Sequence, residues 1–548
     1  MSSHLENISR GILGMLFLIL VCYLLSNNKK AINWKLVGLG IFAQVMFAIG
    51  VLNTKVSGQP VFWLCTGVIL LYNIINKIIK IRSGEATAIS TAPMALFFAA
   101  AWQCIFFFGM IRSTAFGNPG IAILVSIILI TFIIKWLSPK YTELIKWSMR
   151  ARLATLCLSI YAKICRPDIF KTFLEGVSAA FVELLNLSHK GTEFLFGSLA
   201  DDKQTWAYIF AVQVLPNIIF FAALSSVLYY LGILQKIVYV FAYLLNKMNI
   251  SGAESLSTAA NIFLGQTEAP LMIRPYLEKM TRSEILCIMV GGMANTAGSV
   301  LAAYVGFLGG SDPVQQNYFA LHMLSQSIMS APAAIVCSKL LFPETDHHLI
   351  SKELTIPKEK LGDNFLDALS LGTTDGLKLA VNVGAMLIVF TAMMWVVNAL
   401  LGWAGNITHI NSEIAAITNG RYSELSLQMI FGYVFAPVAW LIGVAGSDII
   451  SIGQLLGEKT ILNEFVAYIS LGKMKSANVI TDPKSLLIAT YALCGFANFA
   501  SIGIQIGGIS QLAPNQRRNL TELGIKALIG GTIACLMCGC IAGMLMDQ

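Results

Sequence analysis

Polar side chains interrupt apolar sequence over a short stretch in the middle of the chain. Gln266, Thr267 and Glu268 follow one another there, and Asn295 lies within the next apolar segment. A carboxylate at membrane depth is costly unless it faces a cavity or a partner, so Glu268 is a candidate functional residue. Carboxamide, hydroxyl and carboxylate groups side by side can both donate and accept hydrogen bonds. The stretch therefore predicts a binding site for a polar ligand.

A matching set of polar residues lies in the second half of the chain. Glu464 occupies a short polar-centred segment, and Asn498 and Ser501 interrupt the apolar segment after it. An Ala-Asn pair marks both interruptions, at Asn295 and at Asn498. Paired interrupted segments in corresponding positions of two halves are typical of transporters built from inverted repeats with a midplane site. Single Asn or Ser residues often serve only as hydrogen bonds between membrane helices, but two glutamates with two asparagines favour a shared site.

These residue types suit a neutral, polyhydroxylated ligand that carries a heterocycle. A carboxylate accepts from both hydroxyls of a vicinal diol, a carboxamide can pair with an amide edge, and Phe496 or Phe499 offers a stacking face. An anionic substrate would need a cationic clamp, and the nearby Arg274 is better explained as an interfacial residue at the end of a hairpin arm. Backbone carbonyls freed at helix breaks near Asn261 and Asn295 are ligands of the kind that sodium uses in such folds.

The elements that would position these residues are membrane helices. Hydrophobic residues make up 56% of the chain and charged residues 12%, against about 25% charged in soluble domains. The net charge of +8 falls mostly in short loops, which indicates membrane orientation rather than nucleic-acid binding. The 11 cysteines lack ligand spacing, so we expect small buried side chains rather than metal ligands or disulfides. The composition predicts an all-α, multi-pass membrane protein.

The first polar stretch is too short to belong to a spanning helix. Only about ten apolar residues precede Gly265, against roughly 20 in a span. Gly265, Pro270 and Pro275 then predict a helix that enters the membrane, turns and leaves. Irregular backbone at such depth is tolerated only where it is buried in protein or lines a wet cavity. We therefore expect a re-entrant hairpin.

Cap signals place the two interrupted helices. Thr281 and Glu284 form a capping box before the helix that reaches Asn295. Asp482 followed by Pro483 supplies a cap and a first-turn proline for its counterpart in the second half. Both helices are therefore expected to begin at the membrane surface and to break in its interior.

Apolar runs predict the remaining membrane segments. We expect a clear span with Pro216 inside it over residues 206–231 and an interfacial helix over 170–187. His347 and His348 lack helical ligand spacing and are expected to be solvated loop residues. The other expected spans cover residues 11–25, a second ending near 52, 61–79, 94–110, 121–137, 320–341, 377–401, 427–444 and a last helix after residue 518.

A series of motifs extends over most of the chain outside about residues 55–165. They include Gly-Gln-Thr-Glu-Ala-Pro and Asn-Glu-Phe-Val-Ala-Tyr, and in order they occupy residues 214–221, 228–232, 251–255, 265–270, 297–300, 382–388, 463–468 and 494–498. Through these motifs the chain resembles the concentrative nucleoside transporter family. The resemblance implies an elevator-type transporter with two inverted repeats, each with a re-entrant hairpin and an interrupted helix.

The resemblance also implies which residues form the sites. The substrate-binding residues would be Gln266, Thr267 and Glu268 with Val300 for the base, and Glu464, Asn498 and Ser501 with Phe496 for the ribose and the pocket wall. Sodium would lie among Asn261, Leu264, Asn295 and Thr296. Asn295 stands where members of the family carry a small hydroxyl residue, so the coupling ion, sodium or a proton, stays open.

The expected organisation has seven segments. They are N-terminal transmembrane helices at 1–54, an extra membrane-spanning insertion at 55–165, an interfacial and a scaffold helix at 166–250, the first repeat at 251–345, a polar loop and scaffold helix at 346–426, the second repeat at 427–512 and a C-terminal transmembrane helix at 513–548. An even number of added crossings would preserve the family's orientation, which requires a fourth crossing near residues 153–164.

The resemblance implies a homotrimer in a bacterial inner membrane that imports nucleosides by symport with sodium or protons. It implies no cofactor beyond the coupling ion and no nucleic-acid partner. Free nucleobases or other nucleoside-like heterocycles are the alternative substrates. A membrane-embedded hydrolase with Glu268 and Glu464 as acid and base is disfavoured, because the sequence shows no nucleophile-base arrangement or metal ligands. A passive channel would differ by giving no accumulation.

Overall fold

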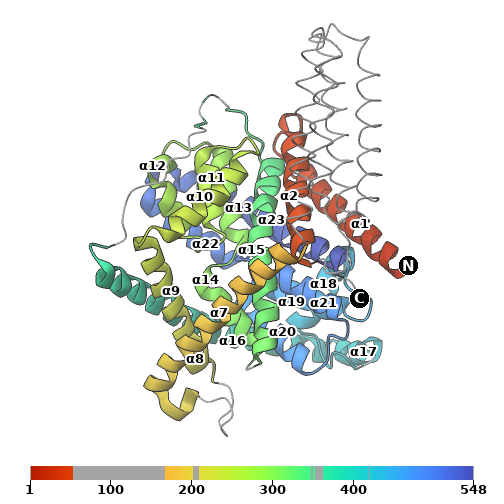
Figure 1. The fold of residues 1–548 in the computed structure, drawn as a ribbon. Helices are drawn as coiled ribbons and strands as arrows, with labels where there is room; N and C mark the ends of the chain where they lie inside the picture. The colour runs from red at the N-terminus through yellow and green to blue at the C-terminus, as the bar shows by residue number, and fades with distance from the viewer. Residues whose placement is uncertain are drawn as a thin grey trace, which may run out of the picture. The chain divides into compact units, whose positions relative to one another are not determined.

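A computed structural model of the 548-residue chain describes residues 2–52, 167–200, 209–310, 312–346, 348, 350–351, 362–418 and 420–546. Every regular element in these ranges is a helix (Figure 1). The predicted insertion at 55–165, with its fourth crossing near 153–164, lies outside the described residues.

The helices before the first hairpin comprise two N-terminal helices and a group that begins near residue 167. They are α1 (Ser2–Leu24), η1 (Lys29–Ala31), α2 (Trp34–Leu52), α7 (Pro167–Phe196), η3 (Gly197–Ala200), α8 (Phe210–Gln213), α9 (Leu215–Tyr230) and α10 (Ile233–Asn246). The predicted interfacial helix at 170–187 is thus part of the longer α7. The predicted span at 206–231 is described from residue 209, and Ala211–Tyr230 is long and apolar enough to cross a membrane, with a turn at Val214 between α8 and α9. Pro216 lies in the first turn of α9 and not in the middle of a helix. In the first turn a backbone N–H has no partner within the helix, so its absence in proline has no cost.

The predicted first hairpin and first interrupted helix are confirmed. The first hairpin consists of α11 (Gly252–Ala260), a loop, η4 (Ala269–Ile273) and α12 (Arg274–Leu277). The interrupted helix consists of α13 (Arg282–Ala294) and α14 (Gly298–Gly309), and we call residues 295–297 between them the first break. Capping boxes open both α11 and α13, at Ser251 and at the predicted Thr281.

The second half repeats this plan. The second hairpin consists of α19 (Ile449–Ile461) and α20 (Glu464–Ser476). The second interrupted helix consists of α21 (Pro483–Leu493) and α22 (Phe499–Leu512), and residues 494–498 form the second break. Asp482 caps α21 through a bond from the Lys484 backbone N–H, as the Asp-Pro pair predicts.

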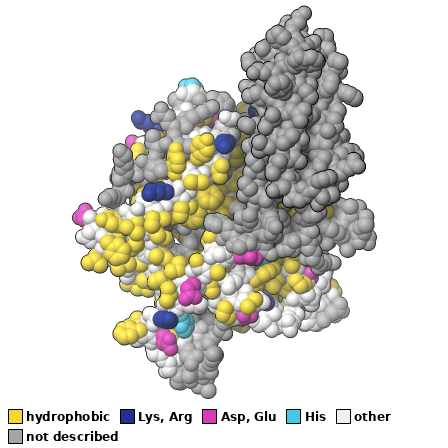
Figure 2. Space-filling model, in the orientation of Figure 1, with side chains coloured by type: hydrophobic (Ala, Val, Ile, Leu, Met, Phe, Trp, Pro, Cys, Tyr) yellow, Lys and Arg dark blue, Asp and Glu magenta, His cyan; other side chains and the backbone are white. Residues whose placement is uncertain are grey.

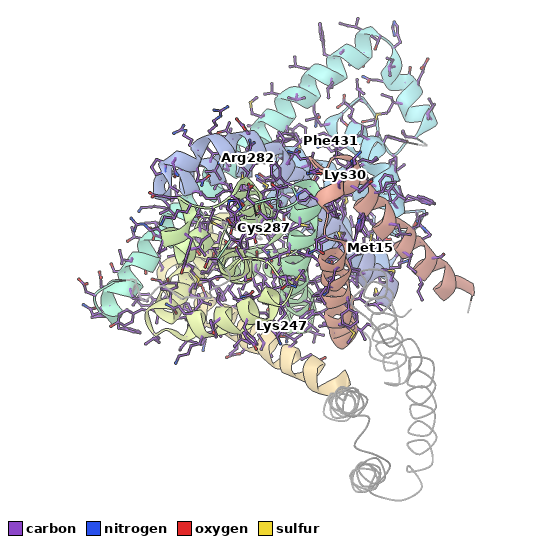
Figure 3. All side chains as sticks on the ribbon, turned by 90° about the horizontal axis from the view of Figure 1, so that it is seen from above. Met15, Lys30, Lys247, Arg282, Cys287 and Phe431 are labelled. Carbon is purple, nitrogen blue, oxygen red and sulfur yellow. The ribbon has the colours of Figure 1, made fainter. Side chains whose placement is uncertain are left out.

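Two long helices contact both interrupted helices. α15 (Pro313–Leu341) and α23 (Arg517–Leu545) each pack against α13 and α21, and α1 and α2 pack on their outer side. Buried apolar side chains fill this region, and Cys287 of α13 lies in its middle whereas Lys247 and Arg282 lie at the edge (Figure 3). The remaining elements are α16 (Phe365–Ile407), α17 (Ile410–Ile417), α18 (Leu427–Leu441) and η5 (Pro514–Gln516).

Several helices are long and apolar enough to span a bilayer. Among the described residues these candidates are Ala211–Tyr230, Arg282–Gly309, Pro313–Leu341, Phe365–Ile407 and Pro514–Leu545. Apolar side chains cover much of the described face in Figure 2, with few charges between them. Only 11% of the apolar window of α16 is buried, against 94% of the window over α13 and α14. α16 packs on α9 and leaves most of its apolar surface for lipid or for another chain.

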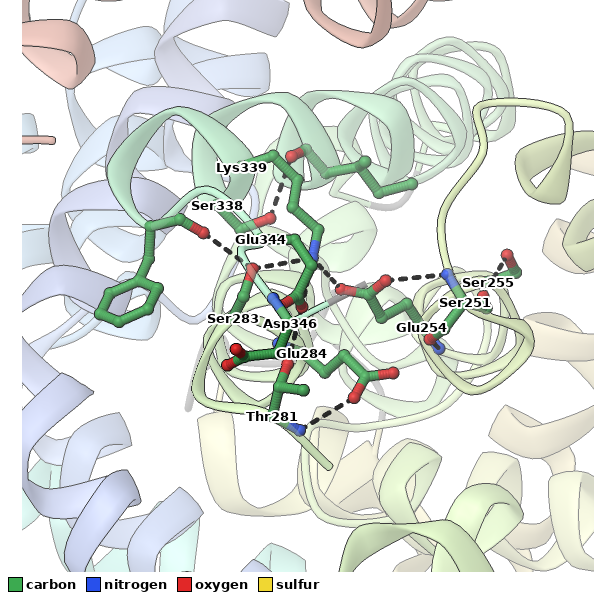
Figure 4. Close-up of polar contacts among 12 residues, drawn as sticks. Ser251, Glu254, Ser255, Thr281, Ser283, Glu284, Ser338, Lys339, Glu344 and Asp346 are labelled. Carbon is green, nitrogen blue, oxygen red and sulfur yellow. Dashed lines mark hydrogen bonds and ion pairs between the residues drawn. The ribbon is translucent and has the colours of Figure 1, made fainter. Parts of the chain in front are cut away.

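A buried ion pair holds the base of the first hairpin (Figure 4). The Lys339 ammonium of α15 lies 2.5 Å from a carboxylate oxygen of Glu254 in α11. It also donates to the Ser283 hydroxyl of α13 at 2.9 Å. Both charged side chains are less than a tenth exposed. One ammonium therefore fixes the starts of α11 and α13 to the end of α15.

Candidate substrate and ion sites

The two hairpins meet the second interrupted helix through predicted site residues. The Gln266 side-chain amide, from the loop of the first hairpin, donates to the Ser501 hydroxyl of α22 at 3.2 Å. The Glu464 carboxylate, at the start of α20, accepts from the Asn498 amide at 2.7 Å. The Tyr304 hydroxyl of α14 donates to the same carboxylate at 3.2 Å. Four residues predicted to contact the substrate are thus brought together from three elements.

The Asn498 side chain forms two hydrogen bonds at the second break. Its side-chain oxygen accepts from the Ser501 backbone N–H at 2.8 Å, so it is the N-cap of α22. Its amide nitrogen at the same time donates to Glu464. Because the cap fixes the side chain, the nitrogen is held toward the carboxylate rather than free to rotate. The local helix start therefore orients the acidic group of the site.

The loop of the first hairpin carries polar groups that can form further hydrogen bonds. Thr267 and Glu268 are exposed, and the side-chain oxygen of Gln266 has no hydrogen-bond partner. A Glu268 carboxylate oxygen accepts from the Gly265 backbone N–H at 3.2 Å, which fixes the direction of this side chain. A Cβ at Gly508 would lie 2.9 Å from the Thr267 methyl group, so the loop packs closely on α22.

The two apolar residues of the predicted substrate site lie beside the breaks. Val300 is buried in the first turn of α14, and Phe496 is buried within the second break. The Phe496 backbone N–H donates to the Asn295 carbonyl at 3.3 Å. The two breaks therefore contact each other directly.

The end of α11 carries buried polar atoms without hydrogen-bond partners. These atoms are the Ser257 and Thr258 hydroxyls and the amide nitrogen and oxygen of Asn261. A Cβ built at Gly291 would lie 3.2 Å from the Asn261 amide nitrogen and 3.7 Å from the Thr258 hydroxyl. Buried polar groups without partners are costly, and oxygen donors are the ligands that hard cations prefer. The donor set therefore fits a sodium ion.

The other predicted ion ligands are already engaged. Asn295 donates its amide to the Gly291 carbonyl at 3.0 Å and accepts from the Ser330 hydroxyl at 2.5 Å. The Thr296 hydroxyl lies 3.3 Å from the Cys494 sulfur, in the second break. Leu264 is buried and its N–H donates to the Ala260 carbonyl. The side chain of Asn295 thus shapes the first break by tying it to α13 and α15.

Sequence reasoning missed the residues that join the two breaks. The Gln326 amide of α15 donates to the Ala294 carbonyl, the last of α13, at 3.2 Å and to the Cys494 carbonyl, the first of the second break, at 2.9 Å. The Cys535 thiol of α23 lies 3.5 Å and 3.0 Å from the same two oxygens. A lone glutamine in an apolar span is a signal that could have identified Gln326. Nothing in the sequence marks Cys535.

Two hairpins that turn inside an all-helical membrane body, each beside a broken helix, define a secondary transporter with two structural repeats. Three family profiles match the chain: Na+ dependent nucleoside transporter N-terminus over residues 13–76, Nucleoside recognition over 211–311, and Na+ dependent nucleoside transporter C-terminus over 322–543.

Known proteins and structures are similar over the same regions. An uncharacterized transporter of Haemophilus influenzae is 44% identical over 67% of this chain and 84% of its own length. Sodium/nucleoside cotransporter 1 of Rattus norvegicus is 41% identical over 66% of this chain and 54% of its own length, so the match spans about half of that relative. The structure of CNTnw in an inward-facing substrate-bound state is similar over 98% of both chains, with 29% identity and a TM-score of 0.69. The chain belongs to the concentrative nucleoside transporter family.

Proposed function

We propose that the protein imports nucleosides by symport with sodium. The observation that carries this proposal is the meeting of the two hairpins at the second interrupted helix, through Gln266 with Ser501 and Glu464 with Asn498. The match to Na+ dependent nucleoside transporter profiles over both halves supports it. The family consists of transporters and not enzymes, and both hairpins supply binding groups at the second interrupted helix.

We assign the ribose to Glu464. Its two oxygens each accept one bond in the structure, from Asn498 and from Tyr304, and a carboxylate has further lone pairs for ribose hydroxyls. The exposed Thr267 and Glu268, with the free oxygen of Gln266, would read the base. Buried Val300 and Phe496 would supply the apolar wall.

We assign sodium to the space between the first hairpin and the first break. Asn261 supplies an unpartnered oxygen there, and Leu264, Asn295 and Thr296 lie at the ends of the two segments where backbone carbonyls leave the helical pattern. The unpartnered hydroxyl of Thr258 lies near the same turn of α13 as Asn261. Binding of sodium would hold the loop with Gln266 in place and so favour nucleoside binding.

The test is uptake of radiolabelled uridine into proteoliposomes. We expect accumulation above the outside concentration under an inward sodium gradient, and much less under a proton gradient alone. Asn295→Ser, which loses the amide bond to Gly291, should change the sodium dependence and not the requirement for a gradient. Accumulation driven only by protons would reject sodium coupling. Uptake of free bases without uptake of uridine would favour the alternative substrate class.

We further propose a homotrimer in a bacterial inner membrane. The exposed apolar face of α16 supports an assembly, with Ile388, Trp395 and Trp403 each at least 65% exposed in one chain. Native mass spectrometry of the purified protein should give the mass of three chains. A monomer mass that persists across mild detergents would reject the trimer.

A further inference from the structure

A buried lysine of the second hairpin forms no ion pair with the residues that the structure describes. Lys459, in the last turn of α19, is 1% exposed. Within the described residues, no carboxylate oxygen lies within the 4.0 Å of an ion pair from its ammonium. Lys339, by contrast, is buried against Glu254. An isolated buried charge is costly, so the position of Lys459 requires another explanation.

The Lys459 ammonium is held by the second interrupted helix. It donates to the Ala492 carbonyl at 2.8 Å, in the last turn of α21 before the second break. The carbonyl end of a helix carries partial negative charge and favours a cation. Glu464, the first residue of the return arm α20, lies five positions after Lys459 and accepts from Asn498 of the break that follows this helix end. The lysine therefore ties the end of α21 to the hairpin that carries the acidic group of the substrate site.

The first repeat has a corresponding position without a charged side chain. Lys459 precedes Ile461, the last residue of α19, by two positions, and Thr258 precedes Ala260, the last residue of α11, by two positions. Thr258 faces the last turn of α13, at Gly291, as Lys459 faces the last turn of α21. The two hairpins therefore carry different side chains at corresponding positions: a hydroxyl at Thr258 in the first repeat and an ammonium at Lys459 in the second.

The difference in chemistry is complementary. The first repeat offers the unpartnered oxygens around Thr258 and Asn261, which suit an exchangeable cation. The second repeat offers an ammonium that is part of the chain. Each repeat also has one glutamate at the start of the hairpin's return arm, Glu268 before η4 and Glu464 at the start of α20. Each hairpin therefore has a carboxylate at the start of its return arm and a position for a cation near the end of its first arm.

We propose that Lys459 is a tethered counterpart of the coupling cation: it takes, in the second repeat, the place that sodium takes in the first. The assignment of the first place to sodium rests on the proposed function. Lys459 is a positioning residue, which acts on the substrate through Glu464 and the second break. One of the two cation positions is permanently filled, so one exchangeable cation accompanies each substrate molecule.

The first test removes the ammonium and supplies it from solution. Lys459→Ala should lower uridine uptake at least tenfold, and methylammonium should restore a large part of it while leaving the parent unchanged. Lys459→Met fills the space without a charge and should be inactive with or without methylammonium. Lys475→Ala is the matched control, because the Lys475 ammonium also donates to a helix-end carbonyl, Leu308 at 2.6 Å, and should stay near parental uptake.

The second test replaces Lys459 by threonine, the residue at the corresponding position of the first repeat. Lys459→Thr should bind a second sodium ion, so the sodium dependence of its melting temperature should steepen from a Hill coefficient of about one toward about two. Parental uptake and parental sodium dependence in Lys459→Met would overturn the proposal. So would a folded Lys459→Ala that is inactive and does not respond to methylammonium. If Lys459→Ala folds only in methylammonium, that recovery supports the proposal, and failure to recover contradicts it.

The melting measurements separate this proposal from the proposed function. They use purified protein and do not require transport. A parent that accumulates no uridine would reject nucleoside import, yet the responses of the Lys459 variants to methylammonium and sodium would still decide whether this position holds a cation.

Discussion

At the scale of single residues, Glu464 has the contacts expected of a substrate ligand. It is 3% exposed, and its partners Asn498 and Tyr304 leave lone pairs available. Glu464→Gln should lower uridine uptake roughly ten- to hundredfold, because hydrogen bonds to a charged acceptor are worth about 1.5–3 kcal/mol. Radiolabelled uridine uptake measures this. Near-normal uptake in the variant would remove Glu464 from the site.

Glu458→Gln is the control for that substitution. Glu458 is a buried glutamate of the same hairpin; one of its oxygens accepts from Gln454, and the other has no hydrogen-bond partner among the described residues. We expect uptake close to that of the parent. A loss as large as that of Glu464→Gln would show that any buried carboxylate of the hairpin is required, and the substrate assignment would fail.

The site could be predicted residue by residue only where polar groups come in runs or matched pairs. Gln266, Glu464, Asn498 and Ser501 stood out in this way, and the structure brings them together. Gln326 and Tyr304 belong to no matched pair of polar runs, and their partners Cys494 and Glu464 lie more than 150 residues away in sequence. Lys459 is a single lysine of the second hairpin, and its carbonyl partner Ala492 lies 33 residues away in sequence.

At the scale of elements, the second break depends on a glycine. Gly495 has φ of +132°, and a Cβ there would lie 2.7 Å from the Ala294 carbonyl and from the Cys535 sulfur. Gly495→Ala should destabilise the protein by about 1–3 kcal/mol, because a strained backbone and a clash with backbone add together. Thermal melting in detergent measures the effect. Gly503→Ala in α22, where a Cβ meets nothing within 4 Å, should melt at or above the parental temperature.

The base of the first hairpin depends on the pair of Lys339 with Glu254. Lys339→Met should destabilise the protein by about 3–5 kcal/mol, because it leaves a buried carboxylate without its partner. Adding Glu254→Gln should recover part of this loss, which a merely steric effect would not allow. Lys378→Met is the control: it breaks an exposed pair with Asp375, and exposed pairs contribute about 0–1 kcal/mol. Equal melting shifts in both lysine variants would contradict the argument.

Element boundaries were predictable where a cap or a proline marks them. The capping box at Thr281 and the Asp482-Pro483 pair predicted the starts of α13 and α21. The length of α16 was not predictable, since Phe365–Ile407 continues through polar turns on either side of the apolar core at 377–401. Nor was the interruption at Val214, because proline is compatible with both a kinked interior and a first turn.

At the scale of the whole molecule, transport of a neutral nucleoside with one sodium ion moves one positive charge. A membrane potential, negative inside, should therefore raise accumulation. Moving one charge across a potential of 100 mV releases about 2.3 kcal/mol of free energy. A potential of about 100 mV should therefore raise the equilibrium accumulation of uridine roughly fiftyfold. Proteoliposomes with a valinomycin-set potassium potential test this. Uridine accumulation that does not change with the membrane potential would indicate exchange of sodium for another cation.

The overall architecture was the most predictable level. Apolar content, half-length segments and matched interruptions already indicated an all-α transporter with two repeats, because the bilayer permits few ways to satisfy backbone polar groups. The packing of α15 and α23 against both repeats was not accessible. It depends on contacts between helices whose apolar faces differ little in sequence.

The bridge of Gln326 and Cys535 between the two breaks also bears on how the chain is made. Ala294 and Gln326 leave the ribosome early, whereas Cys494 and Cys535 arrive with the last helices. Until these helices are made, the first half is in the bilayer without the contact from Cys535 to the Ala294 carbonyl at the first break. We expect a chain stopped after Ala513 to insert but to be degraded by membrane proteases, with a half-life much shorter than that of the full chain in a pulse-chase experiment.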